Sequence, residues 1–159
     1  MEHDAAERAA RAYASMVFHL AYARTGNQAD AEDVMQEVFL RLVRSKTAFE
    51  SEEHCRAWLL RVTVNCVSDV FRAPWRRHDQ PLDEAQAEPI REREGTGVLE
   101  AVLALPPQYR VPVHLYYYED LPVAEIARTM GKSEQVVKTR LFRARAMLRE
   151  TLKGEVEDA

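Results

Sequence analysis

The sequence predicts an all-α protein made of two small helical domains joined by a flexible linker. Charged residues make up 30% and hydrophobic residues 47% of the 159 residues, a balance typical of amphipathic helices around a core. Only five glycines are present, too few for the turns of an all-β fold. Residues 77–97 combine prolines, glycines and charges with almost no apolar side chains, so burial cannot offset their ordering entropy. The expected domains are 1–75 and 97–153, with a linker at 76–96 and a tail at 154–159.

Three helices are expected in the first domain, at about residues 5–24, 30–44 and 53–73. Asp30 is the expected N-cap of the second helix. Apolar residues recur along that helix at i, i+4 and i+8, which makes it strongly amphipathic: Val34, Met35, Val38, Phe39, Leu42 and Val43. Pro74 ends the third helix, and Trp58 on that helix is expected in the core.

The second domain is expected to start with a short helix, Val98–Leu105. Pro107 suits the first position of the next helix. Pro112 lies inside that helix, where a proline removes a hydrogen bond, so either a kink or a later start is expected. His114, on the apolar face, is expected to be structural.

Residues 121–149 have the layout of a helix-turn-helix. A short helix precedes Gly131, which allows a left-handed turn, and Ser133 can cap the second helix. One narrow buried stripe on that helix is formed by Val137, Leu141, Ala144 and Leu148. The side chains expected to face away from the stripe, towards a DNA major groove, are Lys138, Thr139, Phe142 and Arg143.

The formal net charge of −4 conceals two basic blocks. Residues 55–78 carry five cations against one anion, and residues 121–149 carry seven against two. The segments before, between and after them are acidic. Charges sorted in this way indicate two separate contacts with a polyanion.

Catalysis is not expected, because the chain shows no Ser/His/Asp arrangement, no metal-spaced His or Cys and no glycine-rich phosphate loop. No metal or cofactor is therefore predicted. Cys55 and Cys66 lack CxxC spacing and are expected to be reduced thiols of a cytoplasmic protein. The acidic N-terminus has no apolar h-region, and no apolar run approaches the ~20 residues of a membrane span. Neither a signal peptide nor membrane insertion is expected.

Three motifs occur in a definite order: "DAEDVMQEVFLRLVR", "AWLLRVTVNCVSDVFR", and "LPPQYR" followed by "LYYYEDLPVAEIARTMGKSEQVVKTRLFRARAMLRE". Together they resemble the group IV (extracytoplasmic function, ECF) sigma factors of bacterial RNA polymerase, over about Ala5–Phe71 and Val98–Leu152. The resemblance implies that the first domain is the region 2 helical bundle and the second the region 4 helix-turn-helix. It also implies a non-enzymatic protein that binds core RNA polymerase, directs it to promoter DNA and helps to open the duplex. An anti-sigma factor could bind the free protein.

The resemblance further implies which side chains meet each partner. Core polymerase would dock on the second helix of region 2, through Asp33, Gln36, Glu37, Phe39 and Leu40. The −10 element would be read as single-stranded DNA by Ser51, Glu52, His54, Arg56, Arg61, Asn65 and Arg72. The −35 element would be read by Ser133, Gln135, Lys138, Thr139, Arg140, Phe142, Arg143 and Arg145. Phosphate contacts are expected from Arg140, Arg145 and Arg149.

The chain departs from the family pattern at three places. The loop 49–55 is acidic where that family commonly has an Arg-Gly pair, and Asp120 replaces a common glycine at a tight connection. Gln135 and Val136 replace a common Gly-Thr pair in the recognition helix.

Two other functions are compatible with parts of the sequence. One is a stand-alone helix-turn-helix regulator acting as a dimer, with the N-terminal 75 residues used for dimerisation or sensing. The other is a cytosolic helical adaptor without a DNA role, which would leave the sorted charge unexplained.

Overall fold

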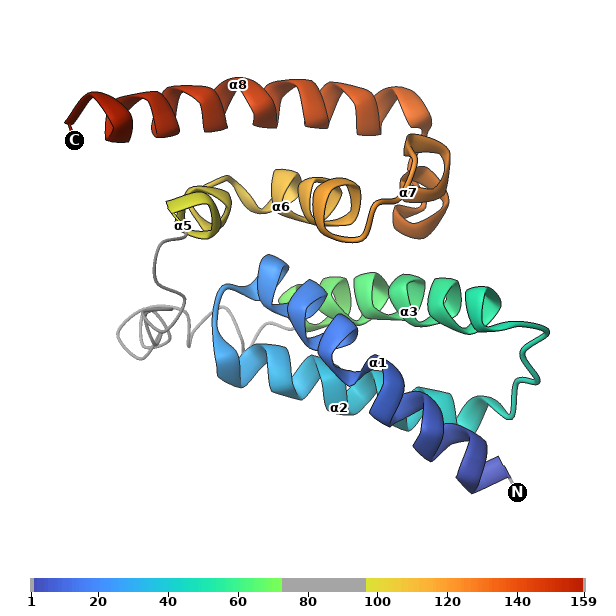
Figure 1. Ribbon diagram of the computed structural model, residues 1–159. Coiled ribbons are helices and arrows are strands. Elements are labelled where there is room, and N and C mark those ends of the chain that lie inside the picture. The colour runs from blue at the N-terminus through green and yellow to red at the C-terminus, as the bar shows by residue number, and fades with distance from the viewer. Residues whose placement is uncertain (1, 73–96, 159) are drawn as a thin grey trace. The chain divides into compact units, whose positions relative to one another are not determined.

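The structure is a computed structural model whose described part is entirely helices and their connections, without strands (Figure 1). Its backbone is described for residues 2–72 and 97–158, and its side chains for residues 5–69 and 100–151. The chain divides into two compact units, Met1–Ala87 and Glu88–Ala159. The predicted all-α class and the two domains are therefore confirmed. The predicted linker, 76–96, lies outside the described residues.

The described part of the first unit, residues 2–72, is a bundle of three helices, each packed against the other two: α1 (Glu2–Thr25), α2 (Gln28–Ser45) and α3 (Glu52–Arg72). Its core contains Val17, Val34, Val38 and Leu59, each 0% exposed. On α2 the buried side chains follow the i, i+4, i+8 pattern that the sequence showed. Trp58 is partly buried and packs against this core, as predicted.

The N-cap of α2 is Asn27, so the prediction of Asp30 was wrong. Asn27 Oδ1 accepts a hydrogen bond from the Asp30 backbone N–H at 2.8 Å, and Asn27 Nδ2 donates to Asp30 Oδ2 at 2.8 Å. Both residue types can cap a helix, and here they act together as a reciprocal pair. Asp30 is therefore the third residue of the helix and is 7% exposed.

Between residues 97 and 158, the second unit contains four α-helices and one π-helical turn: α5 (Gly97–Leu103), α6 (Pro107–Val113), η1 (His114–Tyr118), α7 (Val123–Met130) and α8 (Glu134–Asp158). Helix α8 packs against α5, α6 and α7. In Figure 1, α6 runs alongside α8 and α7 lies across its N-terminal end. Pro107 is the first residue of α6, as predicted. Helix α8 continues past residue 153, the expected end of the domain.

Pro112 neither ends α6 nor delays its start. It is fully buried, and the chain passes directly from α6 into η1, where the Glu119 backbone N–H donates to His114 O at 3.2 Å. A proline inside a helix lacks one N–H donor and crowds the carbonyl of the preceding turn. The sequence predicted a kink or a later helix start at this proline. The structure instead has a wider, π-helical turn immediately after it.

Two tight connections of the second unit use left-handed backbone. Gly131 has φ 66°, and the Lys132 N–H that follows it donates to Ala127 O at 3.0 Å, closing α7 with a Schellman-type bond. Asp120, between η1 and α7, has φ 56°. The family commonly has a glycine at this connection, and the backbone of this chain keeps the left-handed conformation there. Asp120 carries a Cβ, which this conformation disfavours.

Candidate nucleic-acid and partner interfaces

Helix α8 has one buried face and one exposed basic face. Val137, Leu141 and Ala144 are at most 2% exposed, and Leu148 is partly buried. Ser133 caps the helix, because its Oγ accepts a hydrogen bond from the Val136 backbone N–H at 3.2 Å. The predicted cap and the predicted buried stripe are both present.

Three of the four residues predicted to face away from the stripe are exposed. Lys138, Arg143 and Phe142 are exposed, and Phe142 is the most open of them at 70%. Thr139 and Arg140 are partly buried, and Gln135 Nε2 lies 3.4 Å from Thr139 Oγ1. This face is cationic and projects from a capped helix beside a tight turn. Its contacts with DNA stay a prediction.

Arg145 is held by aromatic side chains of η1. Its Nε–H donates to the Tyr117 hydroxyl oxygen at 2.7 Å, and this hydrogen bond raises the pKa of Arg145 above its ordinary value. Its guanidinium carbon lies 5.2 Å from the ring centroid of Tyr116 and 5.8 Å from that of Tyr117. The sequence offered one sign of this arrangement, three consecutive tyrosines, but it gave no reason to pair them with α8.

The loop before α3 is organised by Ser51 and His54. Ser51 caps α3 by accepting the His54 backbone N–H at 3.0 Å, and His54 Nδ1 accepts the Glu50 backbone N–H at 3.2 Å. The Phe49 ring packs edge-on against the rings of His54 and Trp58, with centroids 5.2 and 5.7 Å apart. The side chains of Ser51 and His54, predicted to touch DNA, therefore already shape this loop.

The outer face of α3 changes in charge along its length. Glu50, Glu52 and Glu53 are exposed at its N-terminal end, while Arg61 and Asn65, one helical turn apart, are exposed further along. Of the other residues predicted for the −10 site, Arg56 is partly buried. The side chain of Arg72 lies outside the described residues.

The outward face of α2 brings together three of the five residues predicted to bind core polymerase. Asp33, Gln36 and Leu40 are exposed at a spacing of i, i+3 and i+7, which places them on one side of the helix. Val43, three residues beyond Leu40, continues this side. It is 47% exposed and Leu40 is 49% exposed, so Val43 of the apolar repeat lies outside the core.

The other two predicted residues lie on the flanks of α2. Phe39 is partly buried and packs against the core. Glu37 accepts a hydrogen bond from Arg41 Nε at 3.0 Å, and Arg41 Nη2 also donates to Asp69 of α3 at 3.3 Å. Glu37 raises the pKa of Arg41, and the group of three ties α2 to α3. The Glu37 side chain nevertheless remains 40% exposed, whereas Phe39 lies against the core.

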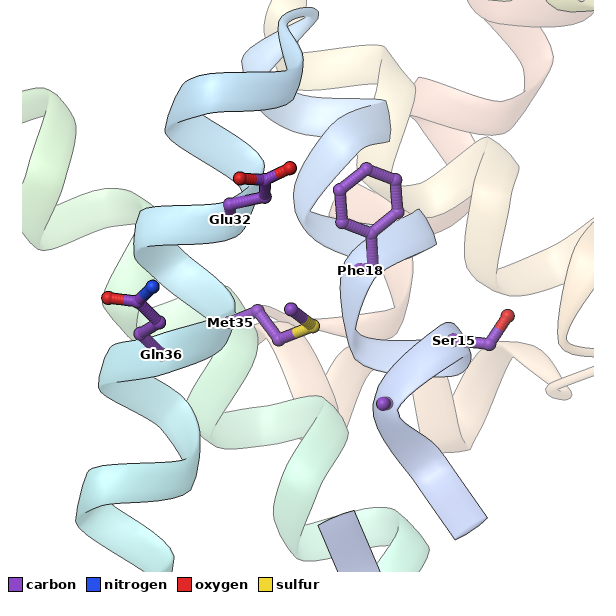
Figure 2. A pocket seen from close by; sticks show the side chains of 6 residues that line it. Ser15, Phe18, Glu32, Met35 and Gln36 are labelled. Carbon is purple, nitrogen blue, oxygen red and sulfur yellow. The ribbon is translucent and has the colours of Figure 1, made fainter. Parts of the chain in front are cut away.

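A pocket of 330 Å³ lies between α1 and α2 beside this face (Figure 2). Phe18 of α1 and Met35 of α2 give it apolar walls, and Gln36 belongs both to the pocket and to the exposed face. The complete lining is Ala14, Ser15, Phe18, Glu32, Met35 and Gln36.

The two cysteines are shielded thiols. Cys66 is 1% exposed, and burial raises its pKa to about 11. Cys55 is 7% exposed, and burial, followed by the nearby Glu52, raises its pKa as well. Both thiols are free. A raised pKa disfavours the thiolate, which is the reactive form of cysteine.

Within the ranges 5–69 and 100–151, no group of three or more His, Cys, Asp or Glu side chains is placed to hold a metal ion. None of the helices in the ranges 2–72 and 97–158 combines the length and the apolar composition that crossing a bilayer requires.

The two units match two different family models. Residues 9–77 match the family described as Sigma-70 region 2, and residues 97–148 match the family described as Sigma-70, region 4. Apart from Arg149, which lies one residue beyond the second range, the matched ranges contain all the candidate residues of α2, α3 and α8.

Several curated relatives are similar along most of the chain. The ECF RNA polymerase sigma factor SigE of Mycolicibacterium smegmatis is 35% identical over 153 residues, and BldN of Streptomyces coelicolor is 34% identical over 154 residues. The matches cover 89% and 90% of this chain but 59% and 58% of those proteins. The ECF RNA polymerase sigma factor SigL of Mycobacterium tuberculosis is 30% identical over 149 residues, which cover 88% of this chain and 84% of SigL.

Two solved structures share the fold at low sequence identity. CnrH, in complex with the cytosolic domain of CnrY, gives a TM-score of 0.69 at 22% identity and covers 96% of this chain and 90% of its own. The sigma factor RpoE of Bartonella quintana, in complex with the anti-sigma factor NepR, gives 0.67 at 17% identity, covering 92% and 96%.

Proposed function

Because the chain belongs to the ECF sigma factors of RNA polymerase, we propose that it binds core RNA polymerase and directs it to a defined class of promoters. In this role the protein performs no catalysis of its own. The second unit reads the −35 element as duplex DNA, and the first unit reads the −10 element as a single strand.

The observation that carries this proposal is the exposed cationic face of α8 within a helix-turn-helix. Lys138 and Arg143 are exposed on a helix whose opposite side is buried, and Gly131 supplies the tight turn before it. A helix held in this way can enter a major groove and present its N-terminal residues to base edges. Arginine suits this place because its guanidinium can donate two parallel hydrogen bonds to a base edge or to a phosphate.

The −10 contact is proposed for the outer face of α3. Arg61 and Asn65 are exposed together and offer a cation and an amide to an unpaired base and its phosphate. The exposed Glu50 and Glu52 repel phosphates, so the strand is expected to approach α3 near Arg61, away from its N-terminal end.

Core polymerase is proposed to dock on the outward face of α2. Leu40 and Val43 leave apolar surface uncovered there, and Asp33 adds a negative charge beside them. An apolar centre with a charged rim is typical of a protein interface. An anti-sigma factor would act by covering the same face.

Reconstituted transcription tests the proposal. The full chain is mixed with bacterial core polymerase and a library of genomic fragments, and the transcripts are sequenced. We expect start sites that share −35 and −10 sequences and that are absent from core polymerase alone. Arg11→Ala, an exposed change on α1, serves as a control and should leave the start sites unchanged. Transcripts identical with and without the protein would contradict the proposal.

A stand-alone dimeric regulator is the second candidate, because Leu40 and Val43 could also bury each other across a two-fold axis. It predicts a dimer in solution that binds a palindrome without polymerase. Sedimentation of the purified chain, with and without DNA, separates the two functions.

A further inference from the structure

We propose that Tyr117, assisted by Tyr116, positions the Arg145 guanidinium for a contact with a DNA phosphate. This inference rests on the proposed function, because it assumes that α8 binds duplex DNA. It assigns a role to two residues outside the helix-turn-helix, and Tyr117 and Tyr116 would themselves read no base.

The geometry fixes the guanidinium but leaves donors unused. The Nε–H of Arg145 is bonded to the Tyr117 hydroxyl at 2.7 Å, and the Tyr116 ring centroid lies 5.2 Å from the guanidinium carbon. An arginine has five N–H donors. Tyr117 takes the Nε–H and Tyr116 also interacts with the guanidinium, so donors on the terminal nitrogens remain for a phosphate. Those donors match the paired geometry of a phosphate. The tyrosines therefore hold the side chain without covering its binding end.

Tyr116, Tyr117 and Arg145 together are called the arginine clamp. The position of Arg145 on α8 places this clamp at the edge of the exposed basic face. One line of side chains at i, i+4, i+7 and i+11 is formed by Lys138, Phe142, Arg145 and Arg149. Lys138, Phe142 and Arg149 are exposed, whereas Arg145 is partly buried because η1 lies against it. A phosphate that reaches this line meets an arginine whose orientation is already set.

Buried residues of η1 anchor the two tyrosines in the second unit. Leu115 is 0% exposed, and the buried His114 ring stacks on Tyr118 with centroids 4.7 Å apart. Tyr117 itself remains 54% exposed. A free arginine loses rotamer freedom when it grips a phosphate. Here most of that freedom is lost on folding, so binding DNA should cost less entropy.

A purely structural tie between η1 and α8 would show the same contacts, so the test must measure DNA binding as well as stability. Holoenzyme is assembled from core polymerase and the full chain carrying Tyr117→Phe, Arg145→Ala or both changes. Its affinity for a promoter fragment found in the transcription experiment is measured over a range of salt concentrations. Tyr118→Phe removes the hydroxyl of the next tyrosine and is the matched control, and thermal unfolding of each variant is recorded.

We expect Tyr117→Phe to weaken binding roughly two- to tenfold, the range for one lost hydrogen bond. Arg145→Ala should weaken it further and reduce the slope of log K against log salt by about 0.9, as for one lost phosphate contact. Adding Tyr117→Phe to Arg145→Ala should then have no further effect on binding. Tyr118→Phe should bind like the unchanged chain.

The clamp would be overturned if Arg145→Ala lowered the melting temperature but left both affinity and salt slope unchanged. It would also be overturned if Tyr117→Phe bound normally while Arg145→Ala did not, because the arginine would then act unaided. A failure of the unchanged chain to give promoter-dependent transcripts is a different result and contradicts the proposed function itself.

Discussion

Removing the exposed apolar side chains of α2 should weaken the grip on core polymerase by an amount that the structure allows us to work out. Leu40 is 49% and Val43 is 47% exposed, so about half of each side chain remains to be buried by a partner. Full burial of such a side chain is worth about 1.5–3 kcal/mol, and half of it about 1 kcal/mol. Each alanine substitution should then raise Kd about fivefold, and Leu40→Ala with Val43→Ala about 30-fold.

The assay is competition between each variant and a fluorescently labelled unchanged chain for core polymerase. Arg11→Ala is the control, because Arg11 is exposed on α1 of the same unit and pairs with the exposed Glu7 at 2.8 Å. Surface pairs of this kind contribute little, so its Kd should not change. Helix content by circular dichroism should match in all variants, since neither apolar side chain belongs to the core.

A double variant that keeps its helix content and its affinity for core polymerase within twofold would refute this reasoning. If the same variant instead changed from dimer to monomer in sedimentation, the face would be a contact between copies of the chain. The dimeric regulator would then be favoured.

Four further substitutions test other parts of the structure. Gly131→Ala should destabilise the protein by about 1 kcal/mol in urea unfolding, because its φ is 66° and nothing lies within 4 Å of the added Cβ. Asp120→Gly should stabilise it by about 0.5 kcal/mol in the same assay, since the left-handed strain at φ 56° is relieved. Burial raises the pKa of Cys66 to about 11, so the thiol loses its proton at a lower pH in the unfolded chain than in the folded one. The stability contributed by this thiol should therefore be fully present below about pH 8.5 and be lost as the pH rises towards 11. The free energy of unfolding should fall less steeply over this range in Cys66→Ala. Arg143→Ala should weaken binding to −35 DNA and reduce its salt slope by about one, while the Kd for core polymerase stays the same.

The helix-turn-helix could be predicted because its signals are local. Gly131 and Ser133 each act within a few residues, and the stripe through Val137 and Leu141 is a periodicity of one helix. The same holds for the amphipathic pattern of α2. Local signals of this kind depend on backbone conformation and helical spacing, which the order of residues already contains.

Tertiary contacts decide the features that the sequence could not predict. Val43 is apolar and adjacent to the buried Leu42, and only the packing of the bundle shows that it points outward. Glu37 bonds to Arg41, which also reaches Asp69, 28 positions further along the chain. Tyr117 and Arg145 are separated by the same number of positions, and a π-helical turn after Pro112 brings them together. Periodicity carries no information about such pairs.

The shielding of both native thiols makes the protein suitable for distance measurements without removing any residue. Cys55 and Cys66 are at most 7% exposed, so maleimide dyes added near neutral pH should react with a newly introduced cysteine and spare the native ones. Exposed alanines at 12 and 104 offer one attachment point on each unit. Energy transfer between two such dyes would report how the separation of the units changes as the chain meets polymerase and then DNA.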